Sequence, residues 1–201
     1  MSLQNRVHVS GIIVSDDSRG LLMGNRGCLH NLQKQVVKNY QLKRWIYCTL
    51  QYYGNRRPVM SPNRYTELFF MDEFTALAAG HRPCAQCQAK KYKSFKTFWQ
   101  VANEMSNVST QAMDNFIHTE RTQNKETLYT LVDLPNGVMV KQKENYYLLY
   151  NNQLYLWSFK GYSQSSAYNT TDLFVLITPV SVMKTIKAGF SIDVIPANLA
   201  F

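Results

Sequence analysis

The chain lacks any apolar run of the ~18 residues that a membrane-spanning helix needs, so we expect no membrane partner. Its first five residues, MSLQN, lack the basic region and apolar core of a signal peptide. We therefore expect a cytoplasmic protein, in a reducing compartment where disulfides are disfavoured. The 201 residues are enough for one domain, or for a core domain with a small appendage.

Acidic residues are scarce in the first half. Residues 1–100 hold 15 Lys and Arg against 5 Asp and Glu, a net charge of +10, whereas residues 101–201 hold 7 against 8, a net charge of −1. A basic field of this size attracts polyanions, nucleic acid first and acidic lipid second, although many basic proteins simply stay soluble in this way. We expect nucleic acid as the partner, DNA ahead of RNA. The oligomeric state stays open.

Cysteine is rare, and all four residues lie in the first half. Cys84 and Cys87 are three positions apart at the start of an expected helix, where free backbone N–H groups stabilise thiolates. A structural zinc site takes four tetrahedral nitrogen or sulfur ligands. The sequence therefore predicts a Zn²⁺ site formed by Cys28, Cys48, Cys84 and Cys87. Two alternatives stay open: His30 as a ligand in place of a thiol, and Cys28 and Cys48 as buried apolar thiols.

The string LAAGHRPCAQCQ, residues 77–88, resembles the second half of the zinc-binding domain of Ada alkylation-repair proteins. The resemblance implies a zinc fold and a role in DNA repair. In that family an upstream Cys-x-x-x-Cys pair supplies the other ligands, one of which accepts a methyl group from a DNA phosphotriester. This chain has no such pair. The chain from Gly24 to Cys87, with DLP at 133–135 and TP at 178–179, is also similar to an uncharacterised bacterial family, which implies no activity.

If the chemistry were of the Ada type, one zinc thiolate would be reactive, and Cys28 is the candidate. It follows a glycine-rich turn and stands near Arg26, where a cation and open backbone favour a thiolate. The competing expectation, which we prefer, is a closed and unreactive site of four cysteines.

Arginines with aromatic residues between them flank the predicted zinc site. Arginine makes bidentate contacts with phosphate, and aromatic rings stack on unpaired bases at ~1–3 kcal/mol per base. The aromatic residues include Trp45, Tyr47 and Tyr65, although alternate residues of a strand face the core. The predicted nucleic-acid-binding residues are Arg26, Arg44, Arg56, Arg57, Arg64, Arg82 and Lys90.

His118 and Glu120 form a His-x-Glu pair. Zinc deaminases of nucleobases combine such a pair with Pro-Cys-x-x-Cys, using the His as a zinc ligand and the Glu as a proton shuttle. Here the order is reversed, and residues two apart on a helix point to different sides. His118 and Glu120 are therefore catalytic candidates only if the site is permuted. The interpretation that we prefer is a surface histidine beside a glutamate that pairs with its neighbours.

Helix and strand patterns divide the chain. Phe70, Phe74 and Leu77 follow i, i+4, i+7, which predicts an amphipathic helix ending at Gly80. Further helices are expected just after Pro83, over 110–122 and over 180–187, and strands over 6–14, 43–53, 138–141, 146–150, 154–157, 173–177 and 190–195. The strands over 146–150 and 154–157 are expected to form a hairpin closed by Asn151 and Asn152. We expect an α+β fold: a zinc-binding N-terminal half of helices and strands, residues 1–125, and a small β-rich C-terminal lobe, residues 126–201.

Three functions follow from these patterns. The first is a zinc-stabilised nucleic-acid-binding protein, with DNA repair as the process that the Ada-like string implies. The second is a zinc- or divalent-metal-dependent enzyme on nucleic acid or nucleotides, either a nuclease or a deaminase-like protein. The third is a protein-interaction module with structural zinc. A catalytic zinc keeps one position open, whereas a structural zinc is closed by four protein ligands, so the ligand count separates the second function from the others.

Overall fold

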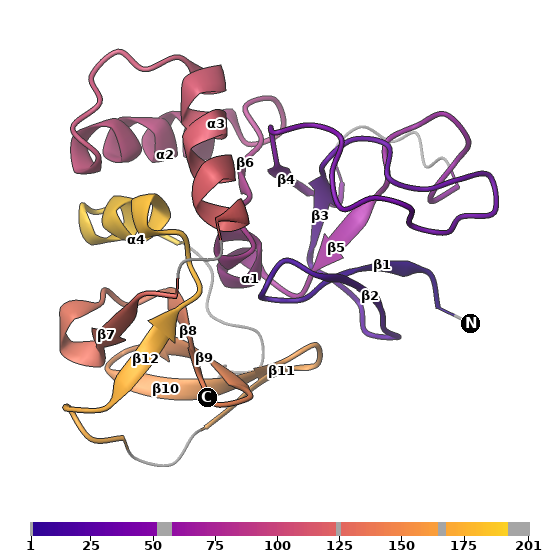
Figure 1. Ribbon diagram of the computed structural model, residues 1–201. Coiled ribbons are helices and arrows are strands. Elements are labelled where there is room, and N and C mark those ends of the chain that lie inside the picture. Colours follow the sequence, from indigo (N-terminus) through magenta and orange to yellow (C-terminus); the bar gives the residue numbers. More distant parts are fainter. Residues whose placement is uncertain (1, 52–57, 124–125, 165–167, 193–201) are drawn as a thin grey trace.

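The computed structural model describes residues 2–51, 58–123, 126–164 and 168–192 (Figure 1). The fold is α+β, as expected, with two six-stranded sheets and four α-helices in this part of the chain. The first sheet has the order β2-β1-β5-β3-β4-β6. Its strands are β1 (Gln4–Val7), β2 (Ile13–Ser15), β3 (Leu22–Asn25), β4 (Ile46–Thr49), β5 (Leu68–Phe70) and β6 (Arg82–Pro83).

The second sheet is antiparallel and has the order β11-β10-β9-β8-β12-β7. Its strands are β7 (Leu128–Thr130), β8 (Val138–Gln142), β9 (Asn145–Tyr150), β10 (Gln153–Ser158), β11 (Gly161–Gln164) and β12 (Leu173–Leu176), with a 3₁₀ turn at Leu131–Asp133. Asn151 and Asn152, both with positive φ, close the β9–β10 hairpin as the sequence predicts.

The helices are α1 (Glu73–Ala78), α2 (Ala89–Ala102), α3 (Thr110–Thr122) and α4 (Val180–Lys187). The predicted ranges of α3 and α4 are confirmed residue for residue. Helix α2 begins six residues after Pro83, because residues 85–88 first form a turn. Phe95 and Trp99 are its buried residues.

Three expected strands are wrong in detail. The strand expected over 43–53 covers only Ile46–Thr49, and residues 52–53 of that range lie outside the described residues. Residues 6–14 form two strands, because the chain reverses at Gly11, whose φ is +88° and whose N–H donates to the His8 carbonyl. Such a φ is readily adopted by glycine. Residues 190–192 form no strand, and the remainder of the predicted last strand, 193–195, lies outside the described residues.

Helix α1 is shorter than predicted, because Phe70 belongs to strand β5 and Asp72 caps the helix. The Asp72 carboxylate accepts a hydrogen bond from the Thr75 N–H at 2.8 Å. The other end is confirmed: Gly80 has φ +75°, its N–H donates to the Leu77 carbonyl, and the next N–H donates to the Ala76 carbonyl. These two bonds form a Schellman cap.

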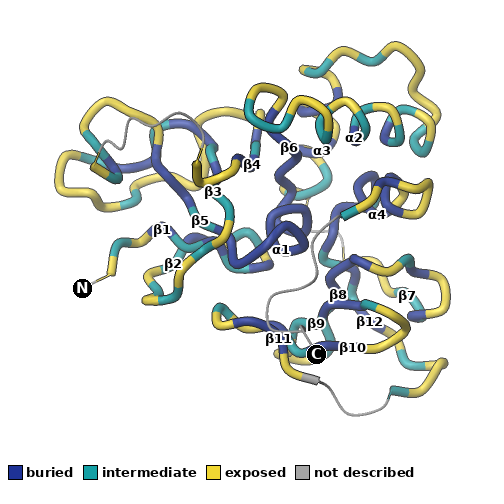
Figure 2. Tube along the Cα trace, turned by 180° about the vertical axis from the view of Figure 1, so that it is seen from behind, coloured by how far each residue is buried: buried dark blue, intermediate teal, exposed yellow. Residues whose placement is uncertain are grey.

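All six residues of α1 are buried, and the helix lies between the two sheets (Figures 1 and 2). Side chains of the second sheet contact its first turn: Trp157 Nε1 donates to Thr75 Oγ1 at 3.0 Å, and the Tyr162 hydroxyl donates to Asp72 at 2.8 Å. The main hydrophobic core likewise joins residues from both sides of the predicted boundary at 125/126. Helix α1 therefore couples the two sheets, and the division into two domains stays a prediction.

Candidate metal centre

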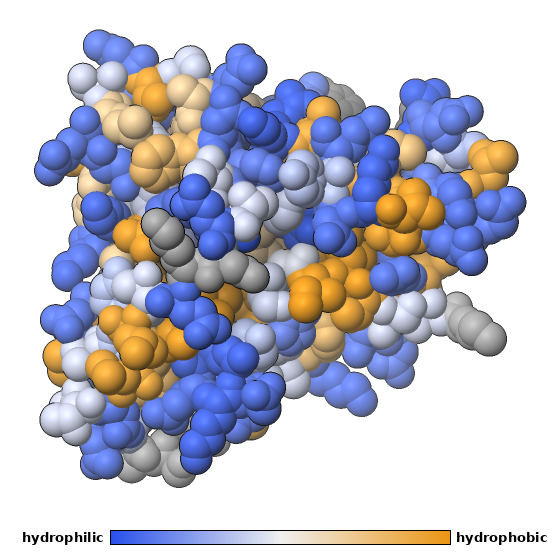
Figure 3. Space-filling view, viewed as in Figure 1, coloured by the Kyte–Doolittle hydropathy of each residue, from blue (hydrophilic) through white to orange (hydrophobic). Residues whose placement is uncertain are grey.

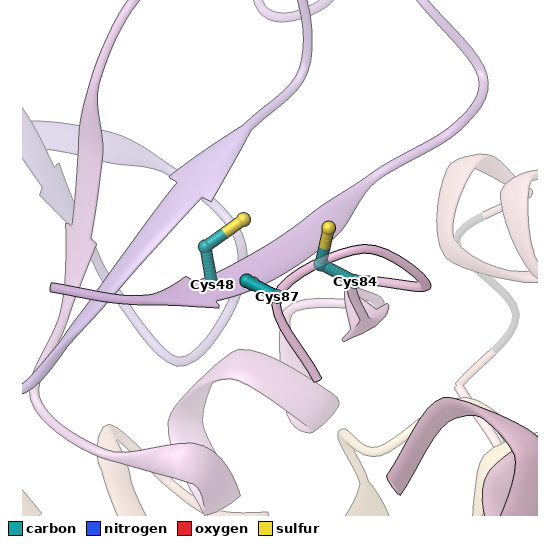
Figure 4. A group of neighbouring side chains, drawn as sticks. All are labelled: Cys48, Cys84 and Cys87. Atoms are coloured by element: carbon teal, nitrogen blue, oxygen red, sulfur yellow. The ribbon is translucent and has the colours of Figure 1, made fainter. Parts of the chain in front are cut away.

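Three cysteines meet at one edge of the first sheet. The Sγ atoms of Cys48, Cys84 and Cys87 all lie within 4.8 Å of one another. Cys48 comes from β4, and the other two come from the turn between β6 and α2 (Figure 4). Three thiols at this spacing form a group that could hold one metal ion.

The register of β4 and β6 explains why Cys48 belongs to this group. The two strands are parallel, with Ile46 opposite Arg82 and Tyr47 opposite Pro83. One further step along both strands brings Cys48 level with Cys84. The Cys84 N–H also donates to the Tyr47 carbonyl at 3.0 Å, which holds the two segments together at this step.

The turn that follows places Cys87 on the same side. The Gln88 N–H donates to the Cys84 carbonyl at 3.0 Å, and Gln88 Nε2 donates to the Tyr47 carbonyl at 2.9 Å. Backbone N–H groups also point at the sulfurs: those of Cys87 and Gln86 at Cys84, and that of Thr49 at Cys87. Free N–H groups directed at sulfur are the local feature that stabilises thiolates.

The three thiols shift one another's pKa values. A hydrogen bond from Cys48, with further bonds from backbone N–H groups, lowers the pKa of Cys84 to about 5, although burial opposes this shift. The same hydrogen bond to Cys84, together with burial, raises the pKa of Cys48, and burial raises the pKa of Cys87. One negative charge is therefore favoured at Cys84, and a divalent ion would favour thiolate at all three.

Cys28 does not join this group. Strands β3 and β4 are antiparallel, with Met23 opposite Cys48 and Asn25 opposite Ile46, so the chain moves away from Cys48 as it approaches Cys28. Each strand residue advances ~3.3 Å, and Cys28 is five residues beyond Met23. Its Sγ lies 3.8 Å from the His30 carbonyl, to which it donates. The structure thus brings together three of the four predicted cysteine ligands.

The alternative ligand His30 also lies outside the group. Its ring is buried, with Nδ1 at 2.6 Å from Thr66 Oγ1 and Nε2 at 3.2 Å from the Ser61 carbonyl. Both ring nitrogens are therefore engaged in holding residues 61–66 against the segment after β3. The antiparallel register that removes Cys28 from Cys48 removes His30 as well.

The catalytic candidates on α3 have separate partners. Arg121 Nη2 lies 2.8 Å from His118 Nδ1, and burial, with Arg121 and Lys43 nearby, lowers the pKa of His118 to about 4. Glu120 accepts hydrogen bonds from the backbone N–H of Ser181, at 3.0 Å, and from its hydroxyl. The two side chains therefore serve different contacts, and neither belongs to the cysteine group.

The predicted nucleic-acid-binding residues separate into buried and exposed sets. Arg26 and Arg82 were expected at the surface but are buried, at 1% and 2% exposure. Arg82 pairs with Asp114, and Arg26 Nε donates to His81 Nε2 at 3.1 Å. Arg44, Arg64 and Lys90 are exposed, whereas Arg56 and Arg57 lie outside the described residues.

Two groups of contacts near the site were not predicted from the sequence. Trp45, just before β4, lies 3.7 Å, centroid to guanidinium carbon, from each of Arg26 and Arg121. On β4 itself, the Tyr47 hydroxyl donates to Glu73, which also accepts from Lys91 Nζ at 2.6 Å. These partners are 18 to 76 positions apart in sequence, so no local spacing signals them.

Comparisons of the chain with protein-family models, with curated proteins and with solved structures find no match. The similarity of residues 77–88 to Ada-type domains and the longer similarity to a bacterial family therefore stay predictions. Among the described residues, no helix combines the length and the apolar character that a membrane crossing requires.

Proposed function

We propose that this protein is a nucleic-acid-binding protein stabilised by a metal ion, Zn²⁺, at Cys48, Cys84 and Cys87. The supporting observation is a basic loop that leads directly into the cysteine group. Residues 18–66 contain no Asp or Glu and nine Lys and Arg. Within this segment, residues 31–44 form a loop of mostly exposed residues that ends two residues before β4.

The loop presents both charge and apolar surface. Its exposed basic residues are Lys34, Lys38, Lys43 and Arg44, and its exposed apolar residues include Leu32 at 71%, Val37 at 62% and Tyr40 at 42%. Figure 3 shows hydrophobic side chains set among hydrophilic ones at the end of the molecule that carries this loop. Basic side chains attract phosphates, and unpaired bases stack on aromatic side chains such as that of Tyr40.

The loop is held in shape by backbone and side-chain contacts. The Asn31 carboxamide accepts from the N–H groups of Gln33 and Gln35. At the far end, the Gln41 N–H donates to the Arg26 carbonyl at 2.9 Å, and Trp45 Nε1 donates to the Leu42 carbonyl. A fixed loop loses less entropy on binding than a flexible one.

The metal site lies at the base of this loop. The loop leads into strand β4. Strand β6, at the edge of the sheet, pairs with β4 over two residues only. A metal ion on Cys48, Cys84 and Cys87 would tie β4 to β6 and to the start of α2. Metal binding would therefore stabilise the segment on which the loop depends, since binding energy at such sites contributes to folding.

The test is a binding titration by fluorescence anisotropy with labelled single-stranded DNA, duplex DNA and RNA. Lys34 and Lys143 are a matched pair, because both are exposed and both have positive φ, 61° and 53°. Lys34→Glu should weaken binding by roughly tenfold, or ~1.4 kcal/mol, and Lys143→Glu should not. Equal affinities of the two variants, or no binding by the wild type at roughly 50 mM salt, where phosphate contacts are strong, would contradict the proposal.

A further inference from the structure

The ligand count at the cysteine group points to chemistry beyond stabilisation. We propose that the metal ion held by Cys48, Cys84 and Cys87 keeps one exchangeable coordination position, filled by water and open to a small external donor such as a thiol. This inference rests on the proposed metal site and adds to it a ligand that does not come from the protein. A metal centre of this kind can bind a donor atom of a substrate directly.

The first argument is the inventory of soft and borderline ligands. All four cysteines and all four histidines lie within the described residues, and only three of these eight side chains form the group. The other five have contacts elsewhere. Cys28 donates to the His30 carbonyl, His30 contacts Thr66 and Ser61, His8 contacts Ser10, His81 contacts Arg26 and Ala79, and His118 contacts Arg121.

The second argument concerns carboxylates. No Asp or Glu of the described residues joins the three sulfurs within the same 4.8 Å. Glu73, whose partner Tyr47 directly precedes Cys48, uses both carboxylate oxygens: one accepts from the Tyr47 hydroxyl and the other from Lys91 Nζ. Moving the buried Glu73 carboxylate to the metal would break its ion pair with the half-buried Lys91 and its hydrogen bond from Tyr47, which is unfavourable.

The third argument is access from solvent. Cys48 and Cys84 are buried, at 8% and 7% exposure, but Cys87 is only half-buried. The residues around it, Ala85, Gln86 and Thr49, are exposed. The group therefore reaches the surface on the side of the 85–87 turn, where a small donor can approach the ion without a change of fold.

The preferred geometry of Zn²⁺ supplies the remaining step. Zn²⁺ is almost always four-coordinate and tetrahedral in protein sites with N and S ligands. Three thiolates leave the centre with a net charge of −1 when water fills the fourth position, and a thiolate there would bring it to −2, the charge of a closed four-cysteine zinc site. Water can therefore fill the position at rest, and a thiol that binds as thiolate would transfer its proton to solvent as it displaces the water.

The experiment replaces Zn²⁺ by Co²⁺ in the full chain and follows its visible spectrum during titration with 2-mercaptoethanol and, separately, sodium azide. We expect tetrahedral Co²⁺ bands that shift along a saturable curve with at least one of the two probes. X-ray absorption of the Zn²⁺ protein should give three sulfurs and one lighter atom. The Cys28→Ser protein should behave identically, which also serves as the control that the fourth ligand is not Cys28.

Each other outcome has a distinct meaning. Four sulfurs at the metal of the Zn²⁺ protein, a spectrum that neither probe changes, or one metal shared by two chains would overturn the exchangeable position and leave the metal site intact. Failure of the wild type to bind Co²⁺ and Zn²⁺ would overturn the metal site itself, and with it this part of the proposed function.

Discussion

Arg82 holds Asp114 through two hydrogen bonds, from Nε to Oδ1 at 2.7 Å and from Nη2 to Oδ2 at 2.9 Å, with both side chains buried. The pair joins β6, immediately before the Cys84 turn, to helix α3. Bidentate geometry gives an arginine–carboxylate pair both strength and a fixed orientation. Arg82 therefore orients the strand that carries the cysteine turn, and it is not presented to phosphate.

The first prediction concerns this pair. Asp114→Asn should lower the free energy of unfolding by about 3 kcal/mol, because it leaves the Arg82 charge buried without its partner. Urea denaturation followed by circular dichroism measures the loss. Asp17→Asn is the matched control, since Asp17 is exposed and its replacement should change stability by less than ~0.5 kcal/mol. Similar urea midpoints for the two variants would show that the Arg82–Asp114 pair contributes little to stability.

The second prediction concerns metal content. Cys48→Ser and Cys84→Ser should lose bound zinc, whereas Cys28→Ser should retain one ion per chain, because Cys28 lies outside the group of three sulfurs. Inductively coupled plasma mass spectrometry on purified protein gives the ratio. Removal of the ion by a chelator should also lower the unfolding temperature of the wild type. Loss of zinc from Cys28→Ser would restore the four-cysteine site expected from the sequence.

The third prediction concerns the exposed arginine before β4. Arg44→Gln should leave stability within ~0.5 kcal/mol of the wild type, because Arg44 is exposed. It should weaken nucleic-acid binding at all sequences alike and reduce the slope of log affinity against log salt by about 1. Titrations at several salt concentrations measure this slope. An unchanged slope would remove Arg44 from the binding surface.

The fourth prediction is a loss of stability in mild acid. Burial, with Arg26 and Arg121 nearby, lowers the pKa of His81 well below its usual range, and burial lowers the pKa of His118 to about 4. The unfolded chain therefore binds protons below about pH 6.5 that the folded chain does not, so stability falls as the pH falls from there toward 4. Urea midpoints between pH 7 and 4 measure the trend.

The His118→Gln variant tests the contribution of one group to that trend. Glutamine does not titrate and still offers an acceptor to Arg121, which lies 2.8 Å from His118. Its stability should therefore depend less steeply on pH between 6.5 and 4 than that of the wild type. Parallel curves for the two proteins would assign the acid sensitivity to other groups, His81 first.

The fifth prediction concerns Glu120. Because its carboxylate accepts from the N–H and hydroxyl of Ser181 in the first turn of α4, Glu120→Ala should destabilise the protein by ~1 kcal/mol, as the loss of a helix cap does. Glu126→Ala, at an exposed position, is the control. The measurement is the thermal unfolding temperature of each variant. Equal unfolding temperatures for Glu120→Ala and Glu126→Ala would argue against a capping role for Glu120.

Local signals in the sequence were sufficient for much of the secondary structure. The ranges of α3 and α4, the Gly80 cap and the Asn151–Asn152 hairpin all depend on residues within one or two turns of each other. Hydrophobic periodicity, a left-handed glycine and paired asparagines act over such short distances. The Cys84-x-x-Cys87 pair belongs to the same class, since its geometry is set by one turn.

The identity of the third cysteine was decided by strand pairing. Cys28 and Cys48 are alike in sequence terms, and both are separated from Cys84 by more than thirty residues. The parallel pairing of β4 with β6 brings Cys48 level with Cys84, and the antiparallel pairing of β3 with β4 carries Cys28 away. Arg26 and Arg82, predicted as surface cations, are buried for the same reason: their partners His81 and Asp114 are brought to them by the fold. Composition and local sequence patterns determine the charge, the helices and the turns of this protein. Strand register and burial depend on which distant segments pair, and only the tertiary structure decides that pairing.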